Sequence, residues 1–413
     1  ENGMDIARFN FSHGDYEEQK SRLDMLKSIR DELDLPIAAL LDTKGPEIRT
    51  GLLKDEKKVT LKEGQTYTLT TREIVGDDQI GFINYNGLPA DVEAGNTILI
   101  DDGLIELKVQ EVVNGTDIVC TVVNGGELGM RKGVNVPNVK IKLPALTEKD
   151  KADIRFGIEQ GFDFIAASFV RSKEDVLQIR EILKEHNSKI QIISKIESLQ
   201  GIQNLEEIIE VSDGIMVARG DMGVEIPMEE VPIIQKRIIK LTTAAGKNVI
   251  TATQMLDSMM KHPRPTRAEA TDVANAIYDG TTGIMLSGET ANGDYPLEAV
   301  QTMVRIAERA EKDIDYVGRL QKTGARLPQE QDTTTSICHA TCTVATDLNA
   351  AAIIPVSMSG FTSGMVARFK PNCPIIACTT SRLVWRQMNL QWGVTPLLIA
   401  EENTAEDLFR EAV

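Results

Sequence analysis

The sequence predicts an α/β protein built on a (β/α)8 TIM barrel, with a small β-barrel domain inserted into it and a C-terminal α/β domain. Two observations lead to this prediction. Short apolar runs alternate with amphipathic helical stretches over most of the chain, and polar residues gather at the carboxyl ends of these runs. Repeated β-then-α units favour a parallel sheet. A barrel brings all the carboxyl ends to one face, so the chemistry is expected on that face.

The apolar runs do not alternate with polar residues, which is typical of strands buried on both faces. They cover residues 5–9, 37–41, 164–167, 192–194, 214–217, 248–251 and 283–286. Between them, segments such as 173–185 carry apolar residues at helical spacing. The clustering of polar residues after the runs favours a barrel over an open, doubly wound sheet.

The pattern changes between residues 51 and 140. Short strand-like runs at 59–62, 67–70, 97–100, 104–109 and 118–122 are separated by Gly, Asn and Asp turns. A polar stretch near 311–333 is followed by a new α/β pattern at 351–356 and 374–379. We therefore expect barrel segments at 1–50 and 141–315, an inserted β domain at 51–140, and a C-terminal α/β domain at 316–413.

Composition narrows the possible partners. The 413 residues include 45 Lys and Arg against 62 Asp and Glu, a net charge of −17, which opposes binding to nucleic acid or to an anionic membrane. No apolar run approaches the roughly 20 residues of a transmembrane helix. Residues 1–11 show no signal peptide, and five cysteines are too few and odd in number for a disulfide framework. We expect a cytoplasmic protein whose anionic ligands meet a local group of cations or metal ions.

The most informative segment holds Lys195 and Glu197, which are two residues apart and therefore point to the same side of a strand end. Asp221 follows the next strand and adds a second carboxylate. Such an oxygen-rich pair suits Mg²⁺ or Mn²⁺. The alternative is an interior Lys–Glu ion pair with no catalytic role.

Several residues suit an anion. Gly220 precedes Asp221 at a strand-to-helix turn, where backbone N–H groups are able to hold a phosphate. Arg8 and Arg49, expected on neighbouring strand ends, are planar donors suited to phosphate oxygens, and surface salt bridges are the alternative for each. Together with the metal site they favour a phosphate pocket.

A second group of strand-end residues offers oxygen ligands only: Asn10, Ser12, Asp42 and Thr43. This set suits a monovalent cation, and capping of strand ends explains it equally well. Thr253 carries a hydroxyl that both donates and accepts, so it is able to relay a proton through water, although most strand-end threonines have no such role.

Two further segments have simpler interpretations. The stretch from Cys338 to Cys342 is interpreted as part of a helix and not as a zinc site, because no second ligand pair follows. Residues 357–364 form either a regulatory anion site or an ordinary helix N-cap.

Seven motifs resemble those of the pyruvate kinase family, of the bacterial type, along nearly the whole chain. They are ARFNFSHG at 7–14, LDTKGPEIRTG at 41–51, ISKIE at 193–197, MVARGDMGVEIP at 216–227, ITATQML at 250–256, PTRAEA at 265–270 and IMLSGET at 284–290. The resemblance implies transfer of the phosphoryl group of phosphoenolpyruvate to ADP, which yields pyruvate and ATP in the last step of glycolysis.

The resemblance also implies a set of site residues. Lys195, Thr253 and Arg8 would be catalytic, and substrate would contact Arg8, Lys195, Gly220, Asp221 and Thr253. Nucleotide would contact Asn10, Phe11, Ser12, His13, Arg49 and Lys132. Mg²⁺ would bind Glu197 and Asp221, and K⁺ would bind Asn10, Ser12, Asp42 and Thr43, as in potassium-dependent members that share Glu47.

In the family mechanism that this implies, Lys195 stabilises the transferring phosphoryl group and Thr253 orders the water that protonates the enolate. The inserted domain closes over the site as a lid. The resemblance further implies a homotetramer. In some members a loop like 357–362 binds a sugar-phosphate effector, although Met358 stands here where some fructose-bisphosphate-responsive relatives have lysine.

Family members begin with one more strand, carrying a Thr-Ile-Gly-Pro motif, before the position of Glu1, and their last domain continues past the position of Val413. We therefore expect an open barrel with two unpaired edges and a chain of weak stability. Two alternatives remain. One is a barrel enzyme that uses phosphoenolpyruvate or pyruvate in carbon–carbon chemistry, and the other is a non-catalytic chain that associates with partner subunits.

Overall fold

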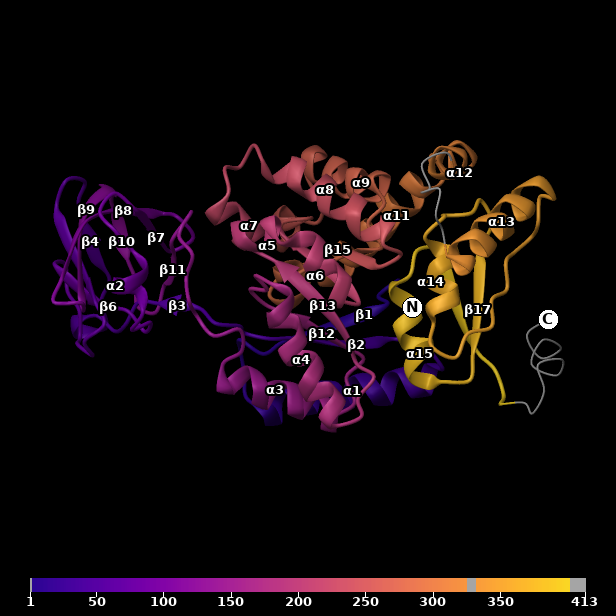
Figure 1. Ribbon diagram of the computed structural model, residues 1–413, viewed down its shortest axis with the longest axis horizontal. Coiled ribbons are helices and arrows are strands. Elements are labelled where there is room, and N and C mark those ends of the chain that lie inside the picture. Colours follow the sequence, from indigo (N-terminus) through magenta and orange to yellow (C-terminus); the bar gives the residue numbers. More distant parts are fainter. Residues whose placement is uncertain (1, 325–331, 402–413) are drawn as a thin grey trace.

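The computed structural model describes residues 2–324 and 332–401, which form three units in a row (Figure 1). A parallel sheet with helices around it lies in the centre. A β-rich unit lies on one side of it and an α/β unit on the other. Residues 325–331 and 402–413 of the expected C-terminal domain lie outside the described residues.

The central sheet is parallel throughout and follows the order β1-β2-β12-β13-β14-β15-β16. Its strands are β1 (Ile6–Asn10), β2 (Ala38–Asp42), β12 (Phe164–Ala167), β13 (Gln191–Ile196), β14 (Gly214–Ala218), β15 (Asn248–Ala252) and β16 (Gly283–Ile284). Within the described chain, β1 and β16 each pair on one side only. The sheet is therefore an open barrel of seven strands, with the two unpaired edges that the sequence predicts.

Side chains alternate between the two faces of this sheet. Leu40, Ile193 and Met216 belong to the core inside the barrel, whereas their neighbours Leu41 and Ile192 pack in the larger core under the helices. Both faces are buried, which explains why the apolar runs show no alternation in sequence. The barrel strands predicted from sequence are confirmed, although β16 covers only the first two residues of the run predicted at 283–286.

Helices connect the strands and cover the outer face of the sheet (Figure 1). The helix predicted at 173–185 is α4, and its ends agree with the prediction. The helices and turns of this unit are α1 (Tyr16–Leu33), α3 (Glu148–Glu159), α4 (Lys173–Glu185), α5 (Leu199–Gln203), α6 (Leu205–Val211), α7 (Arg219–Glu225), α8 (Val231–Ala244), the 3-10 turn η2 (Asp257–Met260), α9 (Arg267–Asp279), α10 (Gly288–Ala291) and α11 (Pro296–Glu311). No helix of the described residues is long and apolar enough to cross a membrane.

The β-rich unit has its own sheet, in the order β3-β11-β7-β8-β9-β5-β6, and a separate β10–β4 pair. Its elements are β3 (Ile48–Arg49), the 3-10 turn η1 (Lys54–Glu56), β4 (Val59–Leu61), β5 (Thr66–Thr70), β6 (Ile80–Phe82), α2 (Leu88–Asp91), β7 (Thr97–Ile100), β8 (Ile105–Val113), β9 (Asp117–Asn124), β10 (Gly126–Leu128) and β11 (Gly133–Asn135). Tyr67, Leu69 and Ile98 lie in a core separate from that of the barrel. The unit joins the barrel next to β3 and β11.

The last unit contains a pair of parallel strands and helices packed on them. It comprises α12 (Tyr316–Gly324), α13 (Thr333–Asp347), α14 (Phe361–Ala367), β17 (Ile375–Thr379), α15 (Arg382–Gln387), the 3-10 turn η3 (Met388–Leu390) and β18 (Val394–Leu398). Cys338 and Cys342 are buried on α13, so the helical interpretation of that segment is confirmed.

The prediction of a strand at 351–356 was wrong, because this segment does not form a continuous strand. It forms only two isolated bridges, Ile353 with Ile375 and Val356 with Cys378. The Ile353 N–H donates to Pro374 O at 3.0 Å and the Cys378 N–H donates to Pro355 O at 2.9 Å, so the segment runs alongside β17. Pro355 has no N–H, and the ladder is interrupted there.

The C-terminal α/β unit packs against the barrel at the amino ends of the barrel strands. Asp163, which is fully buried, accepts a hydrogen bond from Arg386 Nε at 2.7 Å and lies 3.6 Å from Arg30 Nη1. The Gln387 side-chain amide donates to Asp163 O and to Lys189 O at 3.0 Å. Two arginines therefore share one buried carboxylate at this junction.

We predict that Asp163→Asn destabilises the protein. Removing one member of a buried ion pair leaves the remaining charges without compensation and costs about 3 kcal/mol. The measurement is the shift of the urea unfolding curve. Asp24→Asn is the matched control, because Asp24 and its partner Lys20 are 51% and 49% exposed, and such pairs contribute less than about 1 kcal/mol. Equal curves for both variants would contradict a structural role for Asp163.

Candidate active site

The charged residues reach the site through the alternation of the barrel strands. Leu40 faces the barrel interior, and Asp42 follows on the same side at the carboxyl end of β2. Ile193 faces the interior in β13, so Lys195 and Glu197 continue on that side. The same geometry that buries the apolar side chains therefore turns these three charges toward each other.

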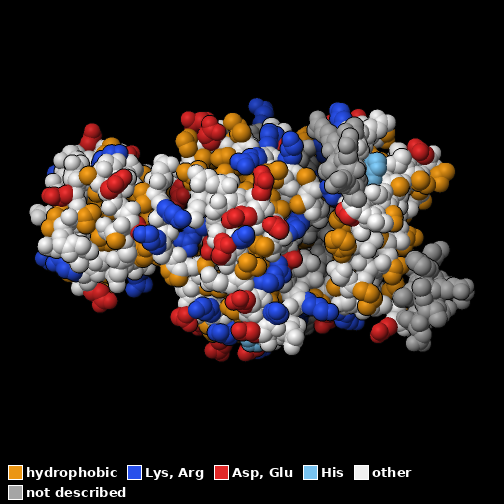
Figure 2. Space-filling view, viewed as in Figure 1, with side chains coloured by type: hydrophobic (Ala, Val, Ile, Leu, Met, Phe, Trp, Pro, Cys, Tyr) orange, Lys and Arg blue, Asp and Glu red, His pale blue; other side chains and the backbone are white. Residues whose placement is uncertain are grey.

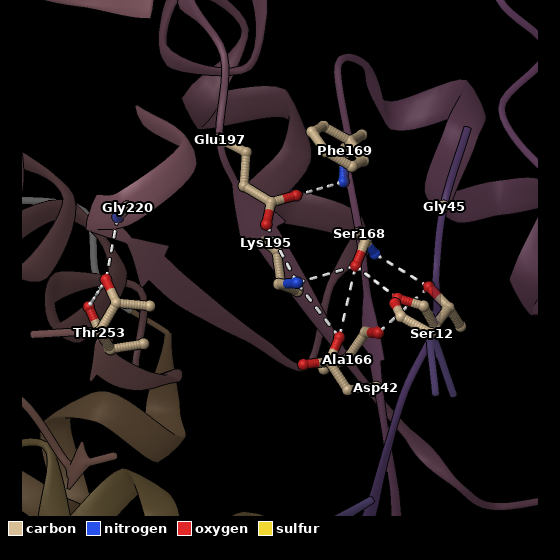
Figure 3. A network of polar contacts seen from close by, with 12 residues as sticks. Ser12, Asp42, Gly45, Ala166, Ser168, Phe169, Lys195, Glu197, Gly220 and Thr253 are labelled. Atoms are coloured by element: carbon tan, nitrogen blue, oxygen red, sulfur yellow. Dashed lines mark hydrogen bonds and ion pairs between the residues drawn. The ribbon is translucent and has the colours of Figure 1, made fainter. Parts of the chain in front are cut away.

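Lys195 lies between two buried carboxylates (Figure 3). Its Nζ is 3.1 Å from Asp42 Oδ1 and 3.0 Å from Glu197 Oε1, and both carboxylate side chains are 1% exposed. Arg8 Nε donates to the other oxygen of Asp42 at 2.6 Å. The spacing of Lys195 and Glu197 thus predicts their shared orientation correctly, and the structure adds Asp42 and Arg8 to the same network.

The network keeps Lys195 charged. Burial opposes the charged form, but the charges of Asp42 and Glu197 outweigh it and raise the pKa of the Lys195 ammonium above its ordinary value. Burial also opposes ionisation of Asp42, yet Lys195 and Arg8 lower the pKa of that carboxyl. The centre therefore holds a fixed cation on an ionised carboxylate.

Glu197 behaves differently from Asp42. Burial is the main cause that raises the pKa of Glu197 to about 7, with Lys195 opposing the rise and the charge of Asp221 adding to it. Burial likewise raises the pKa of Asp221. The two carboxylates are within electrostatic reach of each other, and they repel each other in the ionised form.

The turn after β12 supplies two groups that the sequence analysis missed. Ser168 Oγ accepts a hydrogen bond from Lys195 Nζ at 2.8 Å and donates to Thr43 O at 2.7 Å. The Phe169 N–H donates to Glu197 Oε2 at 2.5 Å, with Phe169 in the left-handed region at φ 54°. The only sequence signal was the position of Ser168, directly after a buried run and level with the polar ends of the neighbouring strands.

The predicted oxygen ligands come from the adjoining ends of β1 and β2, where Asn10 is the register partner of Asp42. Asn10 Oδ1 accepts from the Ser12 N–H at 3.0 Å, and Thr43 Oγ1 accepts from the Ser168 N–H at 3.1 Å. The first contact is a local turn-forming bond, so the capping alternative also describes Asn10, whereas the second joins the ends of β2 and β12. Every donor of the set is an oxygen, which fits a hard monovalent cation.

Gly220 and Thr253 meet on the far side of the site (Figure 3). Helix α7 begins directly after β14, and its Gly220 N–H donates to Thr253 Oγ1 at 2.9 Å. The Thr253 hydroxyl in turn donates to Ala252 O at 2.6 Å. The predicted strand-to-helix turn at Gly220 is confirmed, although the helix has only seven residues.

Arg49 and Lys132 form a separate group. The sequence places Arg49 at a barrel strand end, but it lies in β3, which pairs with β11 in the β-rich sheet. Arg49 Nε lies 2.6 Å from Glu47 Oε2, and Lys132 Nζ lies 2.9 Å from Asp101 Oδ1. Both cations belong to the junction of the two units, where Figure 2 shows lysine and arginine side chains gathered. The strand-end location was wrong because the chain leaves the barrel before residue 48.

Phe11 and His13 follow β1 but differ in exposure. The Phe11 side chain packs in the barrel core against Phe156 and Phe162, so any contact with a nucleotide falls to its backbone. His13 is exposed, and its carbonyl accepts from the Gln19 side-chain amide at 2.8 Å.

One feature of Glu197, in the carboxylate pair that it forms with Asp221, fits a divalent cation. Glu197 Oε1 is buried, lies 3.0 Å from Lys195 Nζ as an ion pair, and accepts no hydrogen bond from any other described residue. Residues 2–324 and 332–401 contain no group of three or more His, Cys, Asp or Glu side chains arranged around a metal position. A two-carboxylate site is typical of Mg²⁺, which keeps several waters and substrate oxygens as ligands.

Models of known protein families match both parts of the chain. The model described as "Pyruvate kinase, barrel domain" matches residues 1–300, and the model described as "Pyruvate kinase, alpha/beta domain" matches residues 335–413. Together they cover most of the sequence.

Individual relatives agree with these matches. The pyruvate kinase of Clostridium acetobutylicum is 52% identical over 413 residues, which is 100% of this chain and 86% of that protein. The pyruvate kinase of Geobacillus stearothermophilus is 50% identical over 100% of this chain and 70% of its own length. A crystal structure of a pyruvate kinase from Cryptosporidium parvum superimposes with a TM-score of 0.96 at 41% identity, covering 99% of this chain and 84% of that one. The chain therefore belongs to the pyruvate kinase family of phosphotransferases.

Proposed function

We propose that this protein transfers the phosphoryl group of phosphoenolpyruvate to ADP and releases pyruvate and ATP. The observation that carries the proposal is the Lys195 ammonium, which is buried between Asp42 and Glu197 at the carboxyl ends of the barrel strands. A preorganised cation in a water-poor site stabilises charge that develops on a transferring phosphoryl group.

Lys195 acts as a positive charge and not as a proton donor. Its raised pKa keeps the ammonium charged at neutral pH, and Ser168 together with the two carboxylates fixes its direction. Arg8, held on Asp42, adds a second cation for the phosphate of phosphoenolpyruvate. The two cations offset the repulsion between two polyanionic substrates in a molecule of net charge −17.

Glu197 and Asp221 are the proposed ligands of the divalent metal that the family requires. When bound to these carboxylates, Mg²⁺ or Mn²⁺ would supply a Lewis acid that stabilises negative charge on the substrate. The Phe169 N–H fixes one oxygen of Glu197 and leaves the other directed into the site. The donor set of Asn10, Ser12, Asp42 and Thr43 is the proposed K⁺ site.

The nucleotide is proposed to contact Arg49, Lys132 and the backbone of residues 10–13. Arg49 and Lys132 are 38% and 37% exposed, so both remain accessible to a ligand. The β-rich unit that carries them acts as the lid. Closing it excludes water that would otherwise accept the phosphoryl group.

Thr253 is proposed to hold the water that protonates the enolate after phosphoryl transfer. Gly220, whose N–H donates to the Thr253 hydroxyl oxygen, is proposed to contact phosphoenolpyruvate. The homotetramer, the sugar-phosphate effector and the cytoplasmic location remain predictions from family membership.

We predict that Lys195→Met lowers kcat by about 10²–10³-fold, because the substitution removes one preorganised charge from the transition state. Pyruvate formation from phosphoenolpyruvate and ADP with Mg²⁺ and K⁺ is the measurement. Lys236→Met is the control, because Lys236 pairs with Asp279 and is 59% exposed on the outer helices. Undiminished turnover in Lys195→Met would remove the role assigned to this residue.

Potassium dependence tests the proposed oxygen ligands. We expect pyruvate formation to collapse when Na⁺ replaces K⁺, because the oxygen set of Asn10, Ser12, Asp42 and Thr43 would need to contract around the smaller ion. The measurement is the turnover rate in matched chloride salts. Equal rates in the two salts would contradict the proposed K⁺ site.

We predict that divalent metal binding weakens below neutral pH. A carboxyl must lose its proton before it binds metal, and the pKa of Glu197 is raised to about 7 by burial. The acid form therefore dominates below pH 7, and the dissociation constant for Mn²⁺ is expected to rise about tenfold from pH 8 to pH 6. Titration of Mn²⁺ by electron paramagnetic resonance provides the measurement. Glu197→Gln is the control and should bind Mn²⁺ weakly and with a smaller pH dependence, whereas a flat profile for the unmodified protein would contradict the assignment.

A further inference from the structure

Arg219 is a mostly buried cation beside the site, and neither the sequence motifs nor the proposed mechanism assigns it a role. It is the first residue of α7 and directly precedes Gly220. Its side chain is 12% exposed and reaches from the end of β14 across to the segment that follows β15. It therefore links the two strand ends that carry Gly220 and Thr253.

One side of the Arg219 guanidinium pairs with a carboxylate, and the other side donates hydrogen bonds to two backbone carbonyls. Nη1 pairs with Asp272 of α9 at 2.6 Å. Nε donates to Ala252 O at 3.2 Å, and Nη2 donates to Thr253 O at 2.5 Å. The planar fork of arginine suits two adjacent carbonyls, and lysine does not reproduce this geometry.

The backbone that Arg219 holds is strained. Thr253 and Gln254 lie consecutively in the left-handed region, at φ 71° and 53°. A β-branched residue rarely adopts this conformation, and it persists only where the surroundings enforce it. The bond from Arg219 to Thr253 O is a contact that enforces it here.

Arg219 also donates to the same carbonyl that accepts the hydrogen bond of the Thr253 hydroxyl. Ala252 O accepts from both Thr253 Oγ1, at 2.6 Å, and Arg219 Nε. A carbonyl that already accepts a charged donor holds a second donor less strongly. The Thr253 hydroxyl is thereby easier to turn toward a water or substrate in the site, while the Gly220 N–H keeps its oxygen in place.

We propose that Arg219, oriented by Asp272, is a positioning residue that fixes the strained backbone at Thr253 and sets the direction of its hydroxyl for the protonation step. The inference rests on the proposed function, because it takes from it the role of Thr253. Arg219 touches neither substrate nor metal in this account, and it acts through Thr253.

The experiment separates positioning from simple structural support. Arg219→Lys is compared with Arg30→Lys, an equally buried arginine at the opposite end of the barrel. Arg30 donates to Ile37 O at 2.9 Å, lies 3.6 Å from Asp163, and is 8% exposed. Both variants exchange the same side chain, so both are expected to lower the melting temperature.

The specific measurement is the exchange of the methyl hydrogens of pyruvate with deuterium oxide, followed by proton NMR in the presence of Mg²⁺, K⁺ and ATP. This exchange reports proton transfer at the carbon that Thr253 serves. We expect Arg219→Lys to lose about 10–100-fold in exchange rate, the loss typical when a supporting contact is removed. The KM for phosphoenolpyruvate should change by less than about threefold, because binding contacts remain. Arg30→Lys should exchange within about twofold of the unmodified protein.

Asp272→Asn provides a second variant should Arg219→Lys not fold. It leaves Arg219 in place but removes its negative partner, and an intermediate loss of exchange is expected. Exchange in folded Arg219→Lys or Asp272→Asn equal to that of Arg30→Lys would overturn the inference. Absence of pyruvate formation in the unmodified protein would instead overturn the proposed function, so the two failures are distinguishable.

Discussion

The structure of the site depends on one ammonium buried between two carboxylates. Placing Lys195, Asp42 and Glu197 out of water is costly, and the cost is offset only because each charge has close partners of opposite sign and additional hydrogen bonds. Arg8 at the end of β1, and Ser168 and the Phe169 N–H directly after β12, provide these bonds. This network of charges is therefore stable only when β1, β2, β12 and β13 are correctly paired.

Within this network the two carboxylates have different properties. Asp42 receives two cations and stays ionised, whereas Glu197 shares one cation and faces a second acid, Asp221. The first suits a permanent structural role in holding Lys195 and Arg8. The second suits exchange between a proton and a metal ion. Environment, not residue type, separates the two.

Much of this was accessible from the sequence. The buried strands, helix α4, the shared side of Lys195 and Glu197 and the inserted β-rich segment all follow from local periodicity. Ser168 and Phe169 did not, because their contacts to Lys195 and Glu197 are set by the pairing of β12 with β13, which no local pattern encodes. Arg49 was misplaced for a related reason, since a two-residue strand in another sheet has too little periodicity to recognise. The ladder break at Pro355 was visible in the sequence as a residue without an N–H, and the apolar run around it outweighed that signal.

The alternation of side chains along the barrel strands has a consequence for how such a chain tolerates change. Inserting a single amino acid into β2 or β13 would rotate Asp42 or Lys195 toward the helical layer and bring an aliphatic neighbour into the catalytic centre. One such insertion would therefore disrupt the packing of the core and displace a charge of the site at the same time. Differences in length between homologous chains should therefore accumulate in surface connections and in the β-rich unit, and these short strands should stay constant in length.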